Sequence, residues 1–344
     1  MSVISRLKPV LLACLFLIAF NAAAWDRGHV DRFATLPAGA AGPEGITVDR
    51  HGNVYVATFG GGSIPENLFV FDSNGRQLRK VVVRVSGETV GTNLLGIAFH
   101  PANGRLLAAD FGNARVLSVN PTTGIATVFA TIPSTLGSPG PNALGFDQDG
   151  NVYISDSFQG IIWKTGRDGA GGGPAVQFVE SALLRTAGVP PFGANGLDFN
   201  SAGDLFVANT GNDTVVQIPV TNGVPGTPKV FTNSINGADG LLIDEDDNLW
   251  VCANQADEIV VVDKTGKAIA KLGDFEGVRR GSPVGLLFPA SLARDAGWIY
   301  VTNLSLDLRG FSPDFQTVDS AWAAQVTRHT VSRLRARIPR TESD

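Results

Sequence analysis

Short runs of alternating apolar and polar residues recur along the chain, separated by glycine, asparagine and aspartate. Each copy reads small residue or proline, variable residue, glycine, apolar-x-apolar, Asp or Asn, a turn, and an apolar-aromatic run. Period-two alternation predicts β-strands, and turns such as Asp-Gly-Asn supply residues that tolerate positive φ. Each copy therefore predicts a β-hairpin. The copies are residues 43–58, 94–110, 141–156, 194–209, 238–253 and 283–303, the last with a longer insertion.

Two further strand-like runs accompany each hairpin. The third strands are expected at 68–72, 114–120, 160–165, 214–220, 258–263 and 330–338. The fourth strands are expected at 30–36, 78–83, 126–132, 175–180, 228–233 and 267–272. Six groups of four strands at a period of about 45–50 residues predict an all-β, six-bladed β-propeller. Because an outer strand comes first in the chain, we expect this N-terminal strand to complete the last blade and close the ring.

The first residues have the pattern of a secretory signal peptide. Arg6 and Lys8 precede the apolar stretch 9–20, and a small-residue Ala-Ala-Ala motif ends at Ala24. We expect cleavage after Ala24 and export of the protein to a periplasmic or extracellular location. The predicted organisation is a signal peptide at 1–24, a propeller at 25–338 and a C-terminal tail at 339–344.

Composition narrows the function classes. The net charge is −5 and the sequence has no broad basic stripe, which argues against nucleic-acid binding. No segment after the signal peptide approaches 18 uninterrupted apolar residues, so we do not expect an integral membrane protein after cleavage. Cys252 would be the only cysteine of the mature chain, and its strand pattern predicts a buried structural thiol.

The candidate chemistry lies at one repeat position. In a propeller the first strand of each blade lines the central channel, and the residue before the repeat glycine is expected to face the axis. The six positions are Glu44, Leu95, Asn142, Asn195, Asp239 and Val284. Four carry oxygen ligands and two are apolar, whereas a purely structural requirement would apply to every blade. Two carboxylates and two carboxamides converging on one axis suit a hard divalent cation.

The repeats and this ordered ligand set resemble the SMP-30/gluconolactonase/LRE-like family of six-bladed propellers, which is related to NHL-repeat propellers and paraoxonases. The resemblance covers about residues 30–338 and implies that Glu44, Asn142, Asn195 and Asp239 hold one divalent ion. The chain departs from the family pattern at Ile-Thr-Val-Asp after Gly45, where the enzymes have Pro-x-Trp-Asp, and at Asn142-Ala143, where they have Asn-Gly.

The resemblance implies a metal-dependent hydrolase, with a gluconolactonase-like lactonase as the leading expectation. Its substrate would be a small lactone or ester. A divalent ion, Ca²⁺ in the first place with Zn²⁺, Mn²⁺ or Mg²⁺ as alternatives, would polarise the carbonyl and activate water. Asp239 would be both a metal ligand and the general base.

Polar residues at the second-strand ends are expected on the same face as the ligands. They are Thr58, Asp110, Asp156, Asn209 and Asn303. Asp156 and Asn209 are the leading candidates to orient ligands or contact substrate, although such residues also bond the following turn. Loops 133–141, 181–194 and 304–328 are expected to form the rim, the last one as a lid.

Two other functions stay open. The first is a non-catalytic, NHL-like propeller that binds a peptide, a glycan or an envelope protein and uses the ion structurally. The second is a strictosidine-synthase-like propeller, against which the full set of Glu44 and both asparagines argues.

Overall fold

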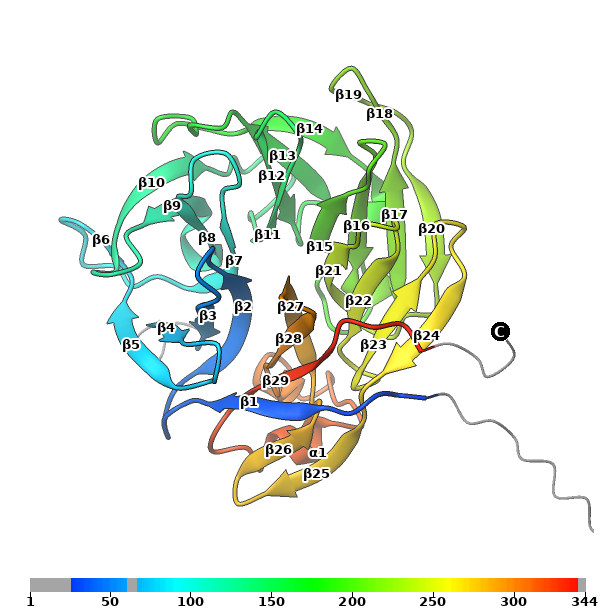
Figure 1. Cartoon of the computed structure of the whole chain (residues 1–344). Helices are drawn as coiled ribbons and strands as arrows, with labels where there is room; N and C mark the ends of the chain where they lie inside the picture. Colours follow the sequence, from blue (N-terminus) through cyan, green and yellow to red (C-terminus); the bar gives the residue numbers. More distant parts are fainter. Residues whose placement is uncertain (1–25, 61–66, 340–344) are drawn as a thin grey trace, which may run out of the picture.

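The computed structural model describes residues 26–60 and 67–339, and nearly all of its regular structure is β-strand. Within these ranges, six sheets surround a central channel like the blades of a propeller (Figure 1). This confirms the predicted six-bladed fold. The predicted signal peptide and residues 340–344 of the predicted tail lie outside the described residues.

The first three blades follow the chain outward from the channel. Blade 1 contains β2 (Gly42–Val48), β3 (Val54–Phe59), β4 (Asn67–Phe71) and β5 (Gln77–Val82). Blade 2 contains β7 (Leu94–Phe99), β8 (Leu106–Asp110), β9 (Arg115–Val119) and β10 (Ile125–Thr131), with β6 (Arg84–Val85) added at its edge. Blade 3 contains β11 (Pro141–Phe146), β12 (Val152–Asp156), β13 (Ile161–Thr165) and β14 (Val176–Glu180).

The last three blades include the closure of the ring. Blade 4 contains β15 (Ala194–Phe199), β16 (Leu205–Asn209), β17 (Thr214–Ile218) and β20 (Lys229–Asn233). Blade 5 contains β21 (Ala238–Ile243), β22 (Leu249–Ala253), β23 (Glu258–Val262) and β24 (Ala268–Leu272). Blade 6 contains β27 (Pro289–Asp295), β28 (Trp298–Asn303), β29 (Thr330–Arg335) and β1 (Asp31–Thr35).

The remaining elements are short insertions between these strands. They are the pairs β18 (Val220–Thr221) with β19 (Val224–Pro225) and β25 (Phe275–Arg279) with β26 (Ser282–Gly285), the 3₁₀ turns η1 (Phe111–Asn113), η2 (Ala182–Leu184), η3 (Thr210–Asn212) and η4 (Leu308–Gly310), and the helix α1 (Ser320–Ala323). Among the described residues, no helix has the length and apolar character needed to cross a membrane.

The N-terminal strand closes the ring as predicted. Strand β1 pairs antiparallel with β29, and Asp31 lies opposite Arg333. The preceding segment is also held, because Arg27 Nη2 lies 2.7 Å from Glu258 Oε2 of blade 5. Closure leaves every blade flanked on both faces by a neighbour, which buries the apolar faces of its sheet.

The core is divided into layers between neighbouring blades. Tyr55 and Leu68 of blade 1, for example, pack in one cluster with Leu106 and Leu117 of blade 2. Strands β3 and β4 are therefore buried along their whole length, whereas the outermost strand β5 alternates between exposed and half-buried positions. Continuous apolar runs in the middle strands follow from this two-sided burial.

The sixth inner strand differs from the prediction. Val284 lies in β26, in the inserted pair with β25, and the strand facing the channel is β27. The residue equivalent to Glu44 in blade 6 is therefore Ala290. Both segments have a Pro followed by small and apolar residues, and only the pairing of β27 with β28 distinguishes them.

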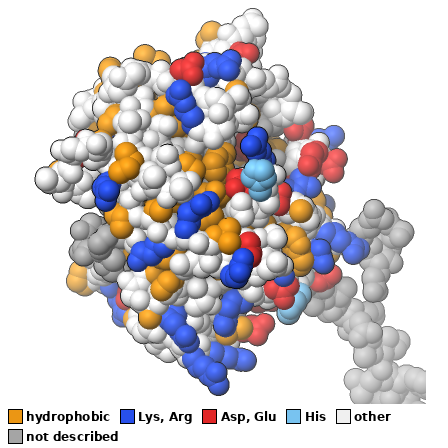
Figure 2. Space-filling view, turned by 60° about the vertical axis from the view of Figure 1, so that its left-hand side comes forward, with side chains coloured by type: hydrophobic (Ala, Val, Ile, Leu, Met, Phe, Trp, Pro, Cys, Tyr) orange, Lys and Arg blue, Asp and Glu red, His pale blue; other side chains and the backbone are white. Residues whose placement is uncertain are grey.

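Charge is dispersed on the surface. Figure 2 shows Lys and Arg side chains spread over one face of the molecule, with neutral, acidic and hydrophobic side chains between them. The arginines near the C-terminus have a local partner, because the guanidinium carbons of Arg333 and Arg335 lie 4.3 and 3.8 Å from the ring centre of Trp298. These cation–π contacts give both guanidinium groups a partner on the neighbouring strand β28.

Candidate metal centre and active site

A β-bulge at the start of each inner strand aims one side chain at the axis. In blade 1 the pairing shifts between Pro43 and Ile46, so that Glu44 and Gly45 together oppose one residue of β3. The same shift occurs in the inner strands of the other five blades. A bulge bends the strand and redirects a side chain. The resulting axis positions are Glu44, Leu95, Asn142, Asn195, Asp239 and Ala290.

The repeat glycine lets the inner strands approach one another. A Cβ atom on Gly45 would lie 2.2 Å from the carbonyl oxygen of Leu95, and one on Gly196 would lie 2.5 Å from that of Asp239. Each glycine thus packs against the axis residue of the next blade. A larger residue at Gly45 or Gly196 would force the neighbouring inner strands apart, which explains the glycine at these positions.

All four predicted ligands face one cavity. Glu44, Asn142, Asn195 and Asp239 line a cavity of about 30 Å³ at the channel. Each of these side chains is buried, with at most 5% of its surface exposed. The other lining residues are Phe59, Leu95, Pro190, Phe192, Thr210, Asn254, Phe288, Leu304 and Leu306.

Three hydrogen bonds orient the polar side of the cavity. Asn142 Nδ2 donates to Ser157 Oγ at 3.0 Å, and Asn195 Nδ2 donates to Thr210 Oγ1 at 3.0 Å. Asp239 Oδ2 accepts from Asn254 Nδ2 at 2.9 Å. In each pair the partner lies immediately after the second strand of the same blade. These bonds use the nitrogen of each amide and one oxygen of Asp239, and they leave Asn142 Oδ1 and Asp239 Oδ1 unpaired.

Several buried oxygens of the cavity lack a donor. Glu44 Oε2, Asn142 Oδ1 and Asp239 Oδ1 have no hydrogen-bond partner among the described residues, and neither has Asn254 Oδ1. A buried acceptor left unpaired costs about 1–3 kcal/mol. Several such acceptors in one cavity therefore fit a positively charged ligand.

The two carboxyl groups are electrostatically unfavourable in the absence of a cation. Burial, and then the charge of Asp239, raise the pKa of Glu44 well above its ordinary value. Burial raises the pKa of Asp239 to about 7, although hydrogen bonds from Asn254 and Asn195 partly lower it. The same two carboxylates, after burial, raise the pKa of the Cys252 thiol, which is fully buried in β22 and is therefore not a nucleophile.

This donor set fits a hard divalent cation. All the unpaired atoms are oxygens, and two carboxylates and two amides would contribute a net charge of −2. No group of three or more His, Cys, Asp or Glu side chains placed to hold a metal ion occurs in the described part of the chain. The fit therefore depends on the two asparagine oxygens and excludes a thiolate or imidazole zinc centre.

The polar residues expected beside the ligands lie one position too early to face the cavity. Successive side chains of a strand point to opposite faces, and Asn209, for example, lies opposite Ala194 and not opposite the axis residue Asn195. None of Thr58, Asp110, Asp156, Asn209 and Asn303 lines the cavity. The residues one position later include Phe59, Thr210 and Leu304, which do line it.

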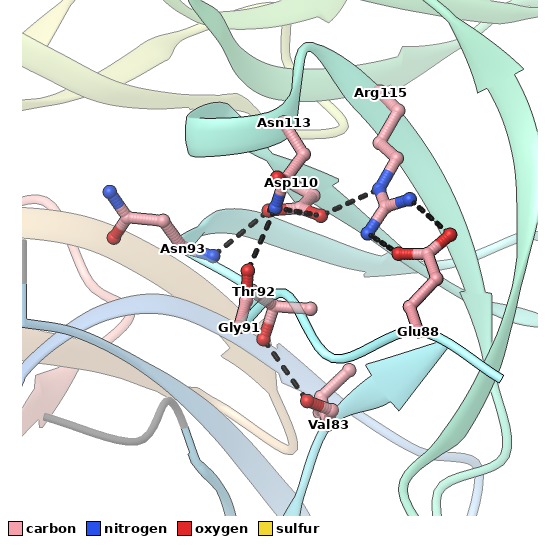
Figure 3. Close-up of polar contacts among 8 residues, drawn as sticks. All are labelled: Val83, Glu88, Gly91, Thr92, Asn93, Asp110, Asn113 and Arg115. Carbon is pink, nitrogen blue, oxygen red and sulfur yellow. Dashed lines mark hydrogen bonds and ion pairs between the residues drawn. The ribbon is translucent and has the colours of Figure 1, made fainter. Parts of the chain in front are cut away.

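Asp110 shows where these side chains point instead. Its carboxylate accepts from the backbone N–H of Asn93 at 2.9 Å and from Arg115 Nε at 2.8 Å, and Arg115 in turn pairs with Glu88 (Figure 3). The group therefore secures the loop that precedes β7. Asp156 likewise accepts from Gly140, Gln159 and Trp163, all within blade 3 or the loop before it.

Asn209, Asn303 and Thr58 have similar local roles. Asn209 Nδ2 donates to the carbonyl of Leu183, and Asn303 Nδ2 donates to the hydroxyls of Thr330 and Ser332. Thr58 bonds the backbone of Asn67 across the blade. The signal that identifies the cavity partners is a hydroxyl or amide fifteen residues after the ligand, as in Ser157, Thr210 and Asn254.

The predicted loops contribute to the rim to different extents. Pro190 and Phe192 of the 181–194 loop line the cavity, as do Leu304 and Leu306 of the 304–328 segment. Phe311 of that segment contacts Phe192, with ring centres 6.0 Å apart. The 133–141 loop reaches the rim through Gly140, where a Cβ atom would lie 2.8 Å from the Phe158 ring.

Comparison with known proteins places the chain in a family. The model of the SMP-30/Gluconolactonase/LRE-like region matches residues 92–273, more than half of the chain. The chain belongs to this family. A second model, for the N-terminal part of strictosidine synthase-like proteins, matches residues 32–62. No curated protein matches the sequence significantly.

Solved structures agree on the fold at low sequence identity. A luciferin-regenerating enzyme superposes with a TM-score of 0.62 at 15% identity, over 90% of this chain and 95% of that one. Regucalcin from Agrobacterium tumefaciens, described as a calcium-binding protein, has a TM-score of 0.58 at 16% identity, over 89% and 97%. A gluconolactonase from Xanthomonas campestris has a TM-score of 0.57 at 14% identity, over 88% of each chain.

Proposed function

We propose that this family member is a metal-dependent lactonase or a related esterase that acts in the cavity at the propeller axis. The observation that carries the proposal is the set of unpaired, buried oxygens of Glu44, Asn142 and Asp239 around one small cavity. The family, which is named in part for gluconolactonase, supports the hydrolytic reading. The calcium-binding relative of the same fold supports Ca²⁺ as the leading candidate ion.

Glu44, Asn142, Asn195 and Asp239 would hold the cation. When bound, a divalent ion supplies electrophilic stabilisation of the developing oxyanion and lowers the pKa of a nearby water. The chain's own residues orient these groups. Ser157 and Thr210 hold the two amides by their Nδ2 atoms, so that the amide oxygens face the cavity.

Asp239 is the proposed general base. Asn254 holds its Oδ2 at 2.9 Å, which leaves Oδ1 free to accept a proton from the attacking water. The water oxygen forms a bond to the carbonyl carbon, the ring C–O bond breaks, and the proton is delivered to the departing alkoxide. The product is a hydroxy acid. General-base catalysis of this kind contributes about 10²–10⁴ in rate.

Hydrolysis of a small lactone panel tests the proposal. We expect turnover with Ca²⁺, loss of turnover with chelator, and loss of about 10²-fold or more in kcat for Asp239→Asn. Asp246→Asn is the matched control, because it makes the same change in the turn of the same hairpin, where the side chain is exposed. Calcium binding without hydrolysis of any lactone or ester would instead favour the binding-module function.

We also propose that the protein is exported. The support is the sequence pattern of residues 1–24, a basic start, an apolar stretch and an Ala-Ala-Ala motif. The intact mass of the protein recovered from its native host should correspond to a chain that begins at Trp25. A mass that includes residues 1–24 would contradict export by this route.

A further inference from the structure

The cavity has an apolar side that the proposed chemistry does not use. Leu95 of blade 2 and Ala290 of blade 6 belong to one buried cluster with Phe59, Phe288 and Leu304. Of these five, all but Ala290 also line the cavity directly. This side faces the same space as the ligand oxygens.

With the unpaired oxygens of the cavity committed to the cation of the proposed function, its polar side has few hydrogen-bond donors left for a polyhydroxylated ligand. The amide Nδ2 atoms of Asn142, Asn195 and Asn254 already donate to partners within the protein. No Lys, Arg or His side chain is among the residues that line the cavity. A ligand hydroxyl buried here without a partner would be penalised, because desolvation of a polar group costs about 1–3 kcal/mol.

Above the cavity, five phenylalanine rings form a continuous chain of contacts, which we call the aromatic collar. Its members are Phe59, Phe111, Phe158, Phe192 and Phe311. Ring centres are 6.3 Å apart for Phe59 and Phe111, and 5.3 Å apart for Phe111 and Phe158. Phe192 stacks on Phe158 at 5.9 Å and contacts Phe311 edge-on at 6.0 Å. The rings come from blades 1, 2 and 3 and from two loops.

The outer members of the collar are accessible. Phe158 is 43% exposed and Phe311 is 49% exposed. Large apolar side chains grouped at the mouth of a cavity indicate a binding surface, because each exposed ring forgoes the stabilisation that burial would provide. The collar and the apolar side of the cavity are continuous through Phe59 and Phe192, which belong to both.

We infer that the ligand of this site is an uncharged lactone or ester that carries an alkyl or aryl substituent, with its carbonyl beside Asp239 and its apolar part against Leu95 and the aromatic collar. This inference rests on the proposed function and specifies its substrate class. The collar residues Phe192 and Phe311 would determine the preference for a substituted lactone. They come from two separate loops and would pack against the substituent.

Kinetics with matched lactones test this inference on the full chain with Ca²⁺. We use three δ-lactones, one unsubstituted, one with a medium-length alkyl chain and one polyhydroxylated. The alkyl lactone should have the highest kcat/KM. Phe192→Ala and Phe311→Ala should each lower the ratio of kcat/KM for the alkyl lactone to kcat/KM for the unsubstituted lactone by about tenfold, mainly through the KM of the alkyl lactone.

Trp322→Ala is the control for these variants. Trp322 is an exposed aromatic residue of the same 304–328 segment, but its ring contacts Phe275 and not the collar. Phe192→Leu is a conservative second variant if Phe192→Ala does not fold. Equal losses for the alkyl and unsubstituted lactones, or a preference for the polyhydroxylated lactone, would overturn the inference.

Calorimetry with lactams separates this inference from the proposed function. Lactam isosteres of the alkyl and polyhydroxylated lactones resist hydrolysis but present the same shape. Suppose that no lactone is hydrolysed but the alkyl lactam binds more tightly than the polyhydroxylated lactam. The lactonase proposal is then wrong, and the inferred ligand class is supported. If the polyhydroxylated lactam binds as tightly or more tightly, the ligand class is wrong whether or not lactones are hydrolysed.

Discussion

The two sides of the channel use the same repeat position for different purposes. In blades 3, 4 and 5 the axis residue is polar and is held by a hydroxyl or amide fifteen residues later. In blades 2 and 6 it is Leu95 or Ala290, which packs in an apolar cluster. Glu44 of blade 1 lies between these two apolar neighbours and opposite the polar arc.

This difference explains why the two carboxyl groups are not equivalent. Asp239 has hydrogen-bond donors and its pKa is raised to about 7, whereas burial and the charge of Asp239 raise the pKa of Glu44 well above its ordinary value. Pairs of carboxyls with different surroundings commonly divide their roles. Glu44 is suited to neutralising a cation, and Asp239, held at one oxygen, is suited to proton transfer.

Removing the charge on the apolar side should have the largest effect. Glu44→Gln is expected to abolish the calcium-dependent rise in Tm and to lower lactone turnover by about 10²-fold or more. Without metal the same variant should be at least as stable as the parent, because the buried charge and its repulsion by Asp239 are gone. Differential scanning calorimetry with Ca²⁺ and with chelator measures both effects. A parent protein whose Tm does not respond to Ca²⁺ would contradict the metal site.

Opening the apolar side should destabilise the fold. Leu95→Ala removes a side chain that is 5% exposed and in the channel cluster, and should lower the free energy of unfolding by about 2–5 kcal/mol. Urea unfolding measures this change. Leu78→Ala, at an exposed leucine on the outermost strand of blade 1, is the control and should change stability by less than about 0.5 kcal/mol. Similar losses for both variants would mean that Leu95 is not part of a close-packed wall.

Removing a hydrogen-bond partner of a proposed ligand, while keeping the ligand itself, should have an intermediate effect on calcium binding and turnover. Asn254→Ala frees Asp239 Oδ2 and is expected to weaken calcium binding or turnover by about 10–100-fold. Asn254→Asp keeps the size but replaces the donor with a third acidic group, and should not rescue. Calcium titration calorimetry provides a readout independent of activity. An unchanged calcium affinity together with unchanged turnover would exclude a positioning role for Asn254.

A second pair of carboxyls, away from the cavity, should produce a smaller pH effect. Burial and the neighbouring Asp319 raise the pKa of Asp257 to about 8, and burial also raises the pKa of Asp319. Glu258 adds negative charge nearby and is itself paired with Arg27 and Lys271. Asp257 also accepts from the backbone N–H of Phe288 at 2.7 Å.

The sign follows from the raised pKa. The folded protein binds a proton that the unfolded chain releases near pH 4, so this stabilisation is complete below pH 4 and is lost as the pH rises through about 8. We therefore expect a lower Tm, and lower amide protection factors in the 304–328 segment after correction for intrinsic exchange, at pH 9 than at pH 7. Asp319→Asn should flatten this pH dependence. An unchanged slope in that variant would assign the effect to other groups.

The sequence alone determined the propeller and the order of its axis residues. Turn residues and period-two alternation recur with the blade, and the repeat glycine marks the position beside which Glu44, Asn142, Asn195 and Asp239 stand. Such local, repeated signals can be recognised in the sequence because each blade forms from strands that are neighbours in the chain. The last blade was the exception, since the inserted pair β25–β26 imitates the repeat and Ala290, not Val284, faces the channel.

Only the tertiary structure decided which neighbours of those residues face the cavity. Asn209 lies opposite Ala194, one residue before the axis position, so its side chain points away from the cavity, whereas Thr210 and Asn254, just past the ends of their strands, face inward. The aromatic collar could not be predicted from the sequence either. Its phenylalanine residues are separated by tens of residues in the chain, and they come into contact only when the blades pack together. Contacts between distant segments depend on how blades pack, and a repeat pattern carries no record of that packing.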